Sequence, residues 1–71
     1  MHIHIAKTNG VLWSGDAISL TAPGSEGEVT ILKGHVPLVT NLRTGRLVVK
    51  DGERELFTHD VDRGVLEVTP T

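Results

Sequence analysis

Two histidines near the start of the chain are the first residues whose spacing could support chemistry. His2 and His4 flank Ile3, and this alternation of polar and apolar residues is typical of a half-buried strand. The rise of a strand would place the two imidazoles on one face, roughly 7 Å apart. A catalytic zinc site normally needs three protein ligands, and the sequence indicates no third. We therefore favour an exposed strand face over a metal-dependent enzyme.

A second polar cluster could support acid–base chemistry. It consists of His59, Asp60 and Asp62, and His and Asp are common general acids and bases. The cluster directly precedes Arg63-Gly64, however, and Asp residues ahead of a glycine suit a turn equally well. Nothing in the sequence indicates that the three side chains share a pocket. We expect a turn at this point and no catalytic residue.

Three glycines, Gly24, Gly27 and Gly34, suggest comparison with a phosphate-binding loop. The sequence lacks the Lys-Ser/Thr ending of a Walker loop, and no helical pattern follows that could direct its N-terminus at a phosphate. No nucleophile-elbow motif supports a Ser-His-Asp triad either. We expect neither a cofactor nor a metal ion to be bound.

The composition narrows the class of protein. A chain of 71 residues forms one domain at most and buries a modest share of its surface, so we expect a partner to add stability. The absence of cysteine excludes disulfides. A net charge of −2 with interspersed signs, one tryptophan and one phenylalanine do not make a nucleic-acid surface. The short apolar runs predict no membrane insertion, and we expect a cytosol-facing protein.

The elements that must position these side chains are strands. Apolar residues alternate with polar ones in short segments, and no window of eleven or more residues shows a helical stripe. Turn-forming pairs that contain glycine recur between the segments, and Asp51-Gly52 predicts a type I′ hairpin. We expect Trp13 and Phe57 in the core or at its edge. The inward-facing residues are expected to include Ile3, Ile5, Ile18, Leu20, Ala22, Val29, Ile31, Leu47, Val49, Leu66 and Val68.

The predicted fold follows from this spacing. Many short strands separated by turns every few residues are typical of a sandwich or small barrel. We predict an all-β domain over residues 1–71, a small flattened β-sandwich of about eight or nine short, mostly antiparallel strands. Pro37 lacks an amide proton, so the strand that begins at 35–37 should lie at an edge or a bulge.

The segment Gly24 to Thr40, GSEGEVTILKGHVPLVT, is more specific than composition. With its neighbours it resembles the epsilon subunit of F-type ATP synthases, whose pattern reads close to P-G-x-x-G-x-x-G/T-I/V-L-P-G-H-x-P-L-V/L-T-x-L-x-x-G. HIHIAKTNGVLWSGDAISLTAP resembles the opening hairpin of that family, and RGVLEV resembles its closing strand. The resemblance covers essentially the whole chain in order.

This resemblance implies a coupling subunit and no active site. The family's N-terminal β-sandwich packs against the gamma subunit of the central stalk and sits on the polar loops of the c-ring, coupling ion flow to ATP synthesis or hydrolysis. By position, Glu26 and Glu28 would contact the c-ring loops, and His35, Val36 and Pro37 would contact gamma. The subunit would be peripheral, on the cytoplasmic face of a bacterial-type plasma membrane.

Three departures from the family pattern matter. Lys33 stands where proline is usual, and Asp62-Arg63-Gly64 replaces a Gly-Gly pair. The sequence stops at Thr71, where the family continues with a last strand and usually a regulatory helical hairpin. We therefore expect a trimmed or unusually short variant, with an unpaired strand edge that favours self-association. A free-standing β-sandwich module that binds a peptide or small ligand is the alternative function.

Overall fold

A computed structural model describes residues 1–34 and 37–70. These residues form eight β-strands and no helix, which confirms the predicted all-β class. The described chain accordingly offers no apolar helix that could cross a membrane. The strands are β1 (His2–Lys7), β2 (Gly10–Asp16), β3 (Ser19–Gly24), β4 (Gly27–Leu32), β5 (Leu38–Leu42), β6 (Gly45–Asp51), β7 (Arg54–Val61) and β8 (Gly64–Thr69).

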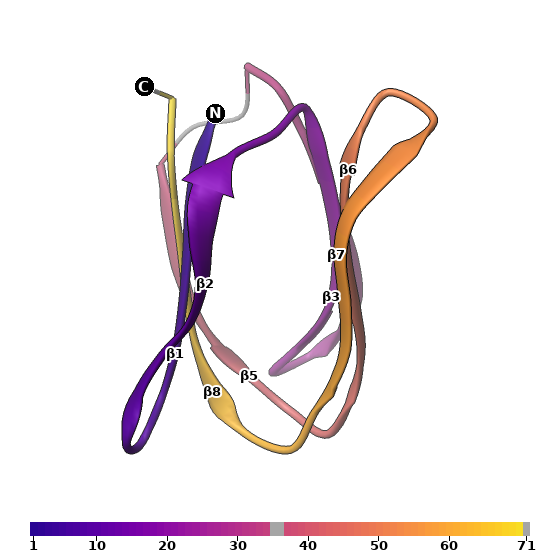
Figure 1. The fold of residues 1–71 in the computed structure, drawn as a ribbon. Coiled ribbons are helices and arrows are strands. Elements are labelled where there is room, and N and C mark those ends of the chain that lie inside the picture. Colours follow the sequence, from indigo (N-terminus) through magenta and orange to yellow (C-terminus); the bar gives the residue numbers. More distant parts are fainter. Residues whose placement is uncertain (35–36, 71) are drawn as a thin grey trace.

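The strands form two layers that meet at one corner. One layer has the order β2-β1-β8-β5 and the other β4-β3-β6-β7, and every pair is antiparallel. A single residue pair, Gly24 with Leu42, joins β3 to β5 and makes the sheet continuous. The two layers face each other across the core (Figure 1). The domain is a β-sandwich, as predicted, but its extents of 26 × 23 × 23 Å make it less flat than expected.

The buried residues follow the alternation of the sequence. Of the residues expected to face inward, all but two are buried. Val29 is half-buried and packs against the core. Ile18 is 37% exposed, so its predicted inward position is wrong. It precedes Ser19, where β3 begins, and the alternation of the strand does not extend to it.

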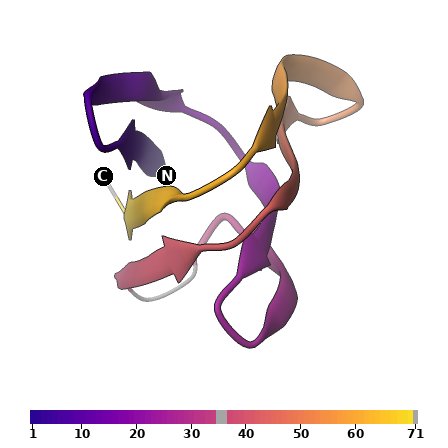
Figure 2. The ribbon, with the colours of Figure 1, turned by 90° about the horizontal axis from the view of Figure 1, so that it is seen from below.

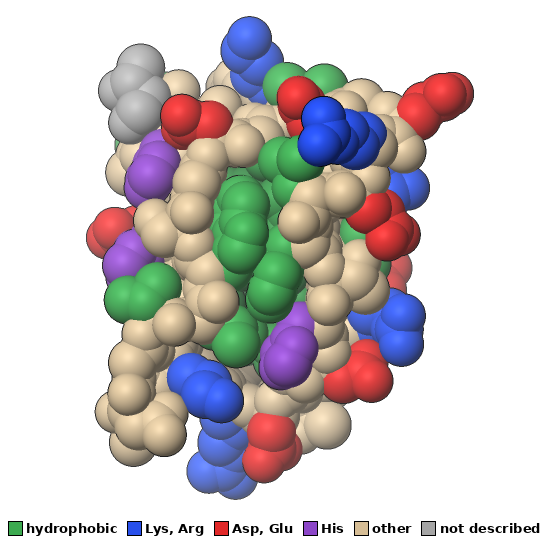
Figure 3. Space-filling view, in the orientation of Figure 1, with side chains coloured by type: hydrophobic (Ala, Val, Ile, Leu, Met, Phe, Trp, Pro, Cys, Tyr) green, Lys and Arg blue, Asp and Glu red, His purple; other side chains and the backbone are tan. Residues whose placement is uncertain are grey.

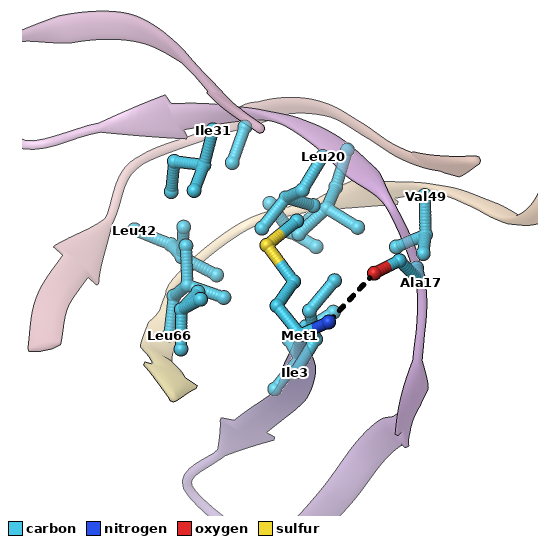
Figure 4. Packing of buried hydrophobic residues seen from close by; sticks show 13 residues of the cluster. Met1, Ile3, Ala17, Leu20, Ile31, Leu42, Val49 and Leu66 are labelled. Carbon is cyan, nitrogen blue, oxygen red and sulfur yellow. Dashed lines mark hydrogen bonds between the residues drawn. The ribbon is translucent and has the colours of Figure 1, made fainter. Parts of the chain in front are cut away.

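Met1, the first residue of the chain, packs in the core between the two layers and exchanges two backbone hydrogen bonds with Ala17. Met1 is buried, and its amino group donates a hydrogen bond to the carbonyl oxygen of Ala17 at 3.1 Å (Figure 4). The amide of Ala17 returns a bond of 3.0 Å to the carbonyl of Met1. Figure 4 shows the Met1 side chain among Ile3, Leu20 and Leu66, which are buried residues of both layers.

The β6–β7 hairpin differs from the prediction by one residue. Asp51 pairs with Arg54, so the two-residue turn consists of Gly52 and Glu53. Gly52 has a φ of 70°, and among residues 1–34 and 37–70 no non-glycine residue has a positive φ. A type I′ turn needs positive φ at both central residues, whereas type II′ needs it only at the first. The predicted type I′ turn at Asp51-Gly52 is therefore wrong, and the backbone fits type II′.

The strands β2 and β7, at the two ends of the path β2-β1-β8-β5-β3-β6-β7, border an open seam. Each strand carries a bulge, because Leu12 and Leu56 are passed over in the pairing with β1 and β6. Across the seam, Trp13 and Phe57 stack with ring centroids 5.9 Å apart, and both pack against the core. Figure 3 shows the resulting apolar stripe between the layers. The aromatic residues lie at the core edge, as expected.

The bulges bear on the expected self-association. An unpaired strand edge is a template for pairing with a second chain, and bulges interrupt the regular hydrogen-bonding row that such pairing needs. β2 and β7 have this interruption, whereas β4 pairs with β3 alone in the described residues and has no bulge. Edge-mediated self-association stays a prediction, and the bulges reduce its expected strength at β2 and β7 only.

Candidate functional site

Four turns lie together at the end of the molecule away from both termini (Figure 1). They connect β1 to β2, β3 to β4, β5 to β6 and β7 to β8, at residues 8–9, 25–26, 43–44 and 62–63. Consecutive antiparallel strands reverse direction, so alternate turns share one end of the sandwich. We call this surface the loop end. Figure 2 views the molecule from this side, with the β1–β2 and β3–β4 hairpins at opposite sides.

The two predicted c-ring contacts lie on one hairpin of the loop end. Glu26 is at the tip of the β3–β4 turn, Glu28 is the second residue of β4, and both are exposed. Gly24 pairs with Gly27 to close the turn. Gly27 has a φ of 126°, which favours glycine. A Cβ on Gly24 would lie 3.0 Å from the carbonyl oxygen of Gly27, so both glycines shape the hairpin.

The neighbouring β5–β6 turn braces this hairpin. The amide of Arg43 donates to the carbonyl of Pro23 at 2.8 Å, and its guanidinium Nη1 donates to the carbonyl of Ser25 at 3.3 Å. On the other side, the Thr44 hydroxyl donates to Asp62, 3.0 Å from its carbonyl oxygen and 2.8 Å from Oδ1. One turn thus connects the β3–β4 and β7–β8 turns and fixes where the glutamates stand.

A groove of about 900 Å³ opens between the turns of the loop end. Its lining includes three basic residues, Lys7 at the end of β1, Arg43 in the β5–β6 turn and Arg63 in the β7–β8 turn. The acidic residues Glu28 and Asp62 line it as well. Sequence reasoning did not identify the three cations as a group. The information was present, because each cation borders an alternate turn of an antiparallel chain. Because alternate turns lie at the same end of the sandwich, counting the turns along the sequence would have predicted that the three cations lie at one end.

The residues predicted to contact gamma lie elsewhere. His35 and Val36 lie outside the described residues. Pro37 is exposed and directly precedes β5, in the connection that leaves β4 at the end opposite the glutamates. The strand expected to begin at His35 begins at Leu38. β5 meets β3 only at its last residue, Leu42, so Pro37 stands beside a largely unpaired strand side, as its missing amide proton predicts.

The paired histidines of β1 do not form a metal centre in the described residues. His2 Nδ1 lies 3.3 Å from Asp16 Oδ1, and its Nε2 lies 3.3 Å from the Ser14 hydroxyl. His4 stands between Ser14 and Glu67 in the pairing of the strands. Across residues 1–34 and 37–70, no three His, Cys, Asp or Glu side chains gather in an arrangement that could hold a metal ion.

The second polar cluster also separates into unrelated contacts. His59 stacks on Phe57 with ring centroids 5.8 Å apart. Asp60 lies 3.3 Å from the guanidinium Nε of Arg46. Asp62 accepts the threonine hydroxyl of the brace. The three side chains face different partners, so they do not form an acid–base site together.

Comparison with known proteins gives a consistent result. A family model described as the β-sandwich domain of the ATP synthase delta/epsilon chain matches residues 1–71. The ATP synthase epsilon chain of Psychrobacter cryohalolentis is 48% identical over 72 residues, covering 99% of this chain and 51% of that protein. ATP synthase epsilon chain 1 of Methylococcus capsulatus is 40% identical over 70 residues, covering 99% and 50%. The chain spans about half the length of the curated relatives it matches.

Proposed function

The chain belongs to the β-sandwich family of ATP synthase delta/epsilon chains, and from this premise we propose that it is a coupling component of a rotary F-type ATP synthase. In this role it links the gamma subunit of the central stalk to the c-ring, so that ion translocation is coupled to ATP synthesis or hydrolysis. It works by shape and charge, and the bond chemistry belongs to other subunits. Its place is peripheral, on the cytoplasmic face of a bacterial-type membrane.

The observation that carries this proposal is the braced pair of carboxylates at the loop end. Glu26 and Glu28 are exposed, yet the hairpin that bears them is tied to Arg43 by two hydrogen bonds. A docking surface transmits force only if its contacts are held in a fixed geometry, and rigid elements hold them better than free loops do. The hairpin meets this requirement, and both of its carboxylates are exposed.

The opposite end supports a second contact. Pro37 is exposed there, and a proline limits the conformations open to the chain before β5. We propose that the connection 33–37 faces gamma while the glutamates face the c-ring. His35 and Val36 belong to this proposal by sequence position alone. Two partners at opposite ends of one compact domain are the arrangement that a coupling element requires.

Reversing the charge of Glu28 tests the function. In ATP synthase that contains this chain, Glu28→Lys should lower ATP-driven proton pumping at least about twofold per ATP hydrolysed, because a cation on the c-ring loop would then meet a like charge. Glu53→Lys is the matched control, since Glu53 is exposed in the β6–β7 turn at the other end. Circular dichroism should show both variants folded. Normal pumping after Glu28→Lys, or equal loss in the control, would contradict the proposal.

A further inference from the structure

The turn between β1 and β2 holds a reactive pair of residues that the proposed function does not use. Asn9 precedes Gly10 there, and Lys7 pairs with Gly10 to close the hairpin. Residues 7–11 are all exposed, and Figure 1 shows this tip at the lower left of the molecule. Within residues 1–34 and 37–70, the side chain of Asn9 makes no hydrogen bond. Its amide is therefore open to water and can turn toward the backbone.

An asparagine that precedes a glycine can lose its side-chain amide without an enzyme, and asparagine is accordingly a thermolabile residue. The backbone nitrogen of the glycine gives up its proton and attacks Cγ of the asparagine. A new C–N bond forms, the side-chain nitrogen leaves as ammonia, and a cyclic succinimide results. Water then opens the ring, giving aspartate if the Cγ–N bond breaks and isoaspartate if the bond to the main-chain carbonyl carbon breaks. The net reaction consumes water, releases ammonia and needs no oxidant or reductant.

Gly10 presents little obstacle to this ring closure. Glycine has no Cβ beside the attacking nitrogen, whereas every other residue carries a side chain there. Apart from its chain neighbours, no heavy atom of the described residues lies within 4 Å of the position that a Cβ on Gly10 would take. The φ of Gly10 is 147°, in the region that favours glycine. The turn therefore favours the residue type that hinders the reaction least.

The pairing of Lys7 with Gly10 opposes the reaction, because it holds the backbone around the attacking nitrogen. This pair is the last of its ladder, and a register shift between Ile5 and Ala6 interrupts the ladder a short way behind it. In the described residues β2 pairs with β1 alone. The end of such a hairpin opens locally at a small cost in free energy, far below that of global unfolding. The reactive geometry is thus accessible while the domain stays folded.

A second asparagine provides an internal comparison, because the sequence has Asn9 and Asn41 and no glutamine. Asn41 is also exposed, but it lies within β5 and precedes Leu42, which is 4% exposed and part of the core. The main chain of Leu42 pairs with Gly64 on one side and with Gly24 on the other. Ring closure at Asn41 would have to displace a core residue from the sheet. The fold therefore protects Asn41 and leaves Asn9 reactive.

We propose that Asn9 is a site of spontaneous deamidation, at which the folded chain is converted to aspartate and isoaspartate. Each product replaces a neutral amide by a carboxylate, which adds negative charge to the loop end close to Lys7. Isoaspartate also lengthens the main chain by a methylene group, so the turn must change its shape. The inference concerns the chemistry of the turn and holds whether or not the loop end docks on the c-ring.

Peptide mapping tests the site directly. Trypsin cleaves after Lys7, Lys33 and Arg43, so Asn9 and Asn41 fall in separate peptides, 8–33 and 34–43. After incubation of the folded chain at neutral pH, mass spectrometry should show amide replaced by hydroxyl in peptide 8–33 at least about tenfold faster than in 34–43, because Asn41 lies in a protected strand. A sample digested before incubation corrects for reaction during digestion. Unaltered peptide 8–33, or equal rates in both peptides, overturns the proposal.

The products and the pH dependence test the succinimide route. Chromatography against synthetic standards should resolve both the aspartate and the isoaspartate forms of peptide 8–33. The rate should rise with pH, because the attacking nitrogen must lose its proton. Aspartate as the sole product would indicate direct hydrolysis of the side chain and would overturn the route through Gly10.

Gly10→Ala is the matched variant, and its methyl group should slow the reaction at least about fivefold by crowding the attacking nitrogen. Circular dichroism checks that the variant folds, since alanine is strained at this φ. An unchanged rate in a folded Gly10→Ala chain overturns the proposal. If the variant does not fold, the ratio of the two products in the unaltered chain still decides the route.

Discussion

The seam and the loop end are both exposed, but different interactions order them. In the seam, Trp13 and Phe57 stack at 5.9 Å on two bulged edge strands and cover the core. At the loop end, Arg43 and Thr44 hold the neighbouring turns by hydrogen bonds to backbone and carboxylate oxygens. The seam is therefore ordered by buried apolar area, and the loop end by directional polar contacts.

This difference separates stability from recognition. Burial of large apolar surface contributes most of the favourable free energy of folding. Small domains have a small net free energy of unfolding, so the loss of any of this buried surface matters. Exposed charges contribute little to stability, so they can be chosen to suit a partner. We expect substitutions in the seam to change the free energy of unfolding, and charge substitutions at the loop end to change docking.

The largest effect is expected for Trp13→Ala. Truncation removes the stacked ring and its packing against the core, which should lower the free energy of unfolding by about 3 kcal/mol. Urea denaturation followed by circular dichroism measures this. Val11→Ala is the control, because Val11 is 60% exposed on the same strand and should cost less than about 0.5 kcal/mol. Equal losses in the two variants would show that the seam stack does not stabilise the domain.

A smaller loss is expected for Gly64→Ala, where the loop end meets the sheet. A Cβ at this position would lie 2.5 Å from the carbonyl oxygen of Ala6, so the backbone of β1 or β8 must shift. Such overpacking typically costs about 2 kcal/mol. Val65→Ala, at the next residue and on the exposed face, should change the free energy of unfolding by less than about 0.5 kcal/mol. Thermal unfolding that leaves Gly64→Ala as stable as Val65→Ala would contradict the close approach.

The sequence predicts the layers better than it predicts their edges. Alternation identifies Leu47, Val49, Leu66 and Val68 because a buried face imposes period two on each strand, and all four are buried. The bulges at Leu12 and Leu56 could not be predicted, because a bulge depends on the register of the partner strand.

The turns show a similar limit. Asp-Gly indicates a hairpin, but whether Asp51 or Gly52 is its first central residue depends on how the flanking strands pair. At the candidate site, only the family resemblance assigns Glu26 and Glu28 to the c-ring. The cations of the groove, Lys7 and Arg63 among them, are far apart in sequence, and only the tertiary arrangement of the turns brings them together.

The smallest effect on stability is expected for Thr44→Val, which tests whether the brace orders the loop end. The variant removes the hydroxyl that donates to Asp62 but keeps the shape of the side chain. An exposed hydrogen bond contributes about 1 kcal/mol or less, so the loss in unfolding free energy should stay below that value. Thr8→Val is the control, since Thr8 is also exposed at the loop end, and in the described residues its side chain makes no hydrogen bond. Amide hydrogen exchange at Arg63 and Gly64 should nevertheless quicken in Thr44→Val and not in Thr8→Val, because local opening at the β7–β8 turn loses its tie to the β5–β6 turn. Unchanged exchange in both variants would mean that strand pairing alone orders the loop end, and the distinction between a packed seam and a hydrogen-bonded loop end would no longer hold.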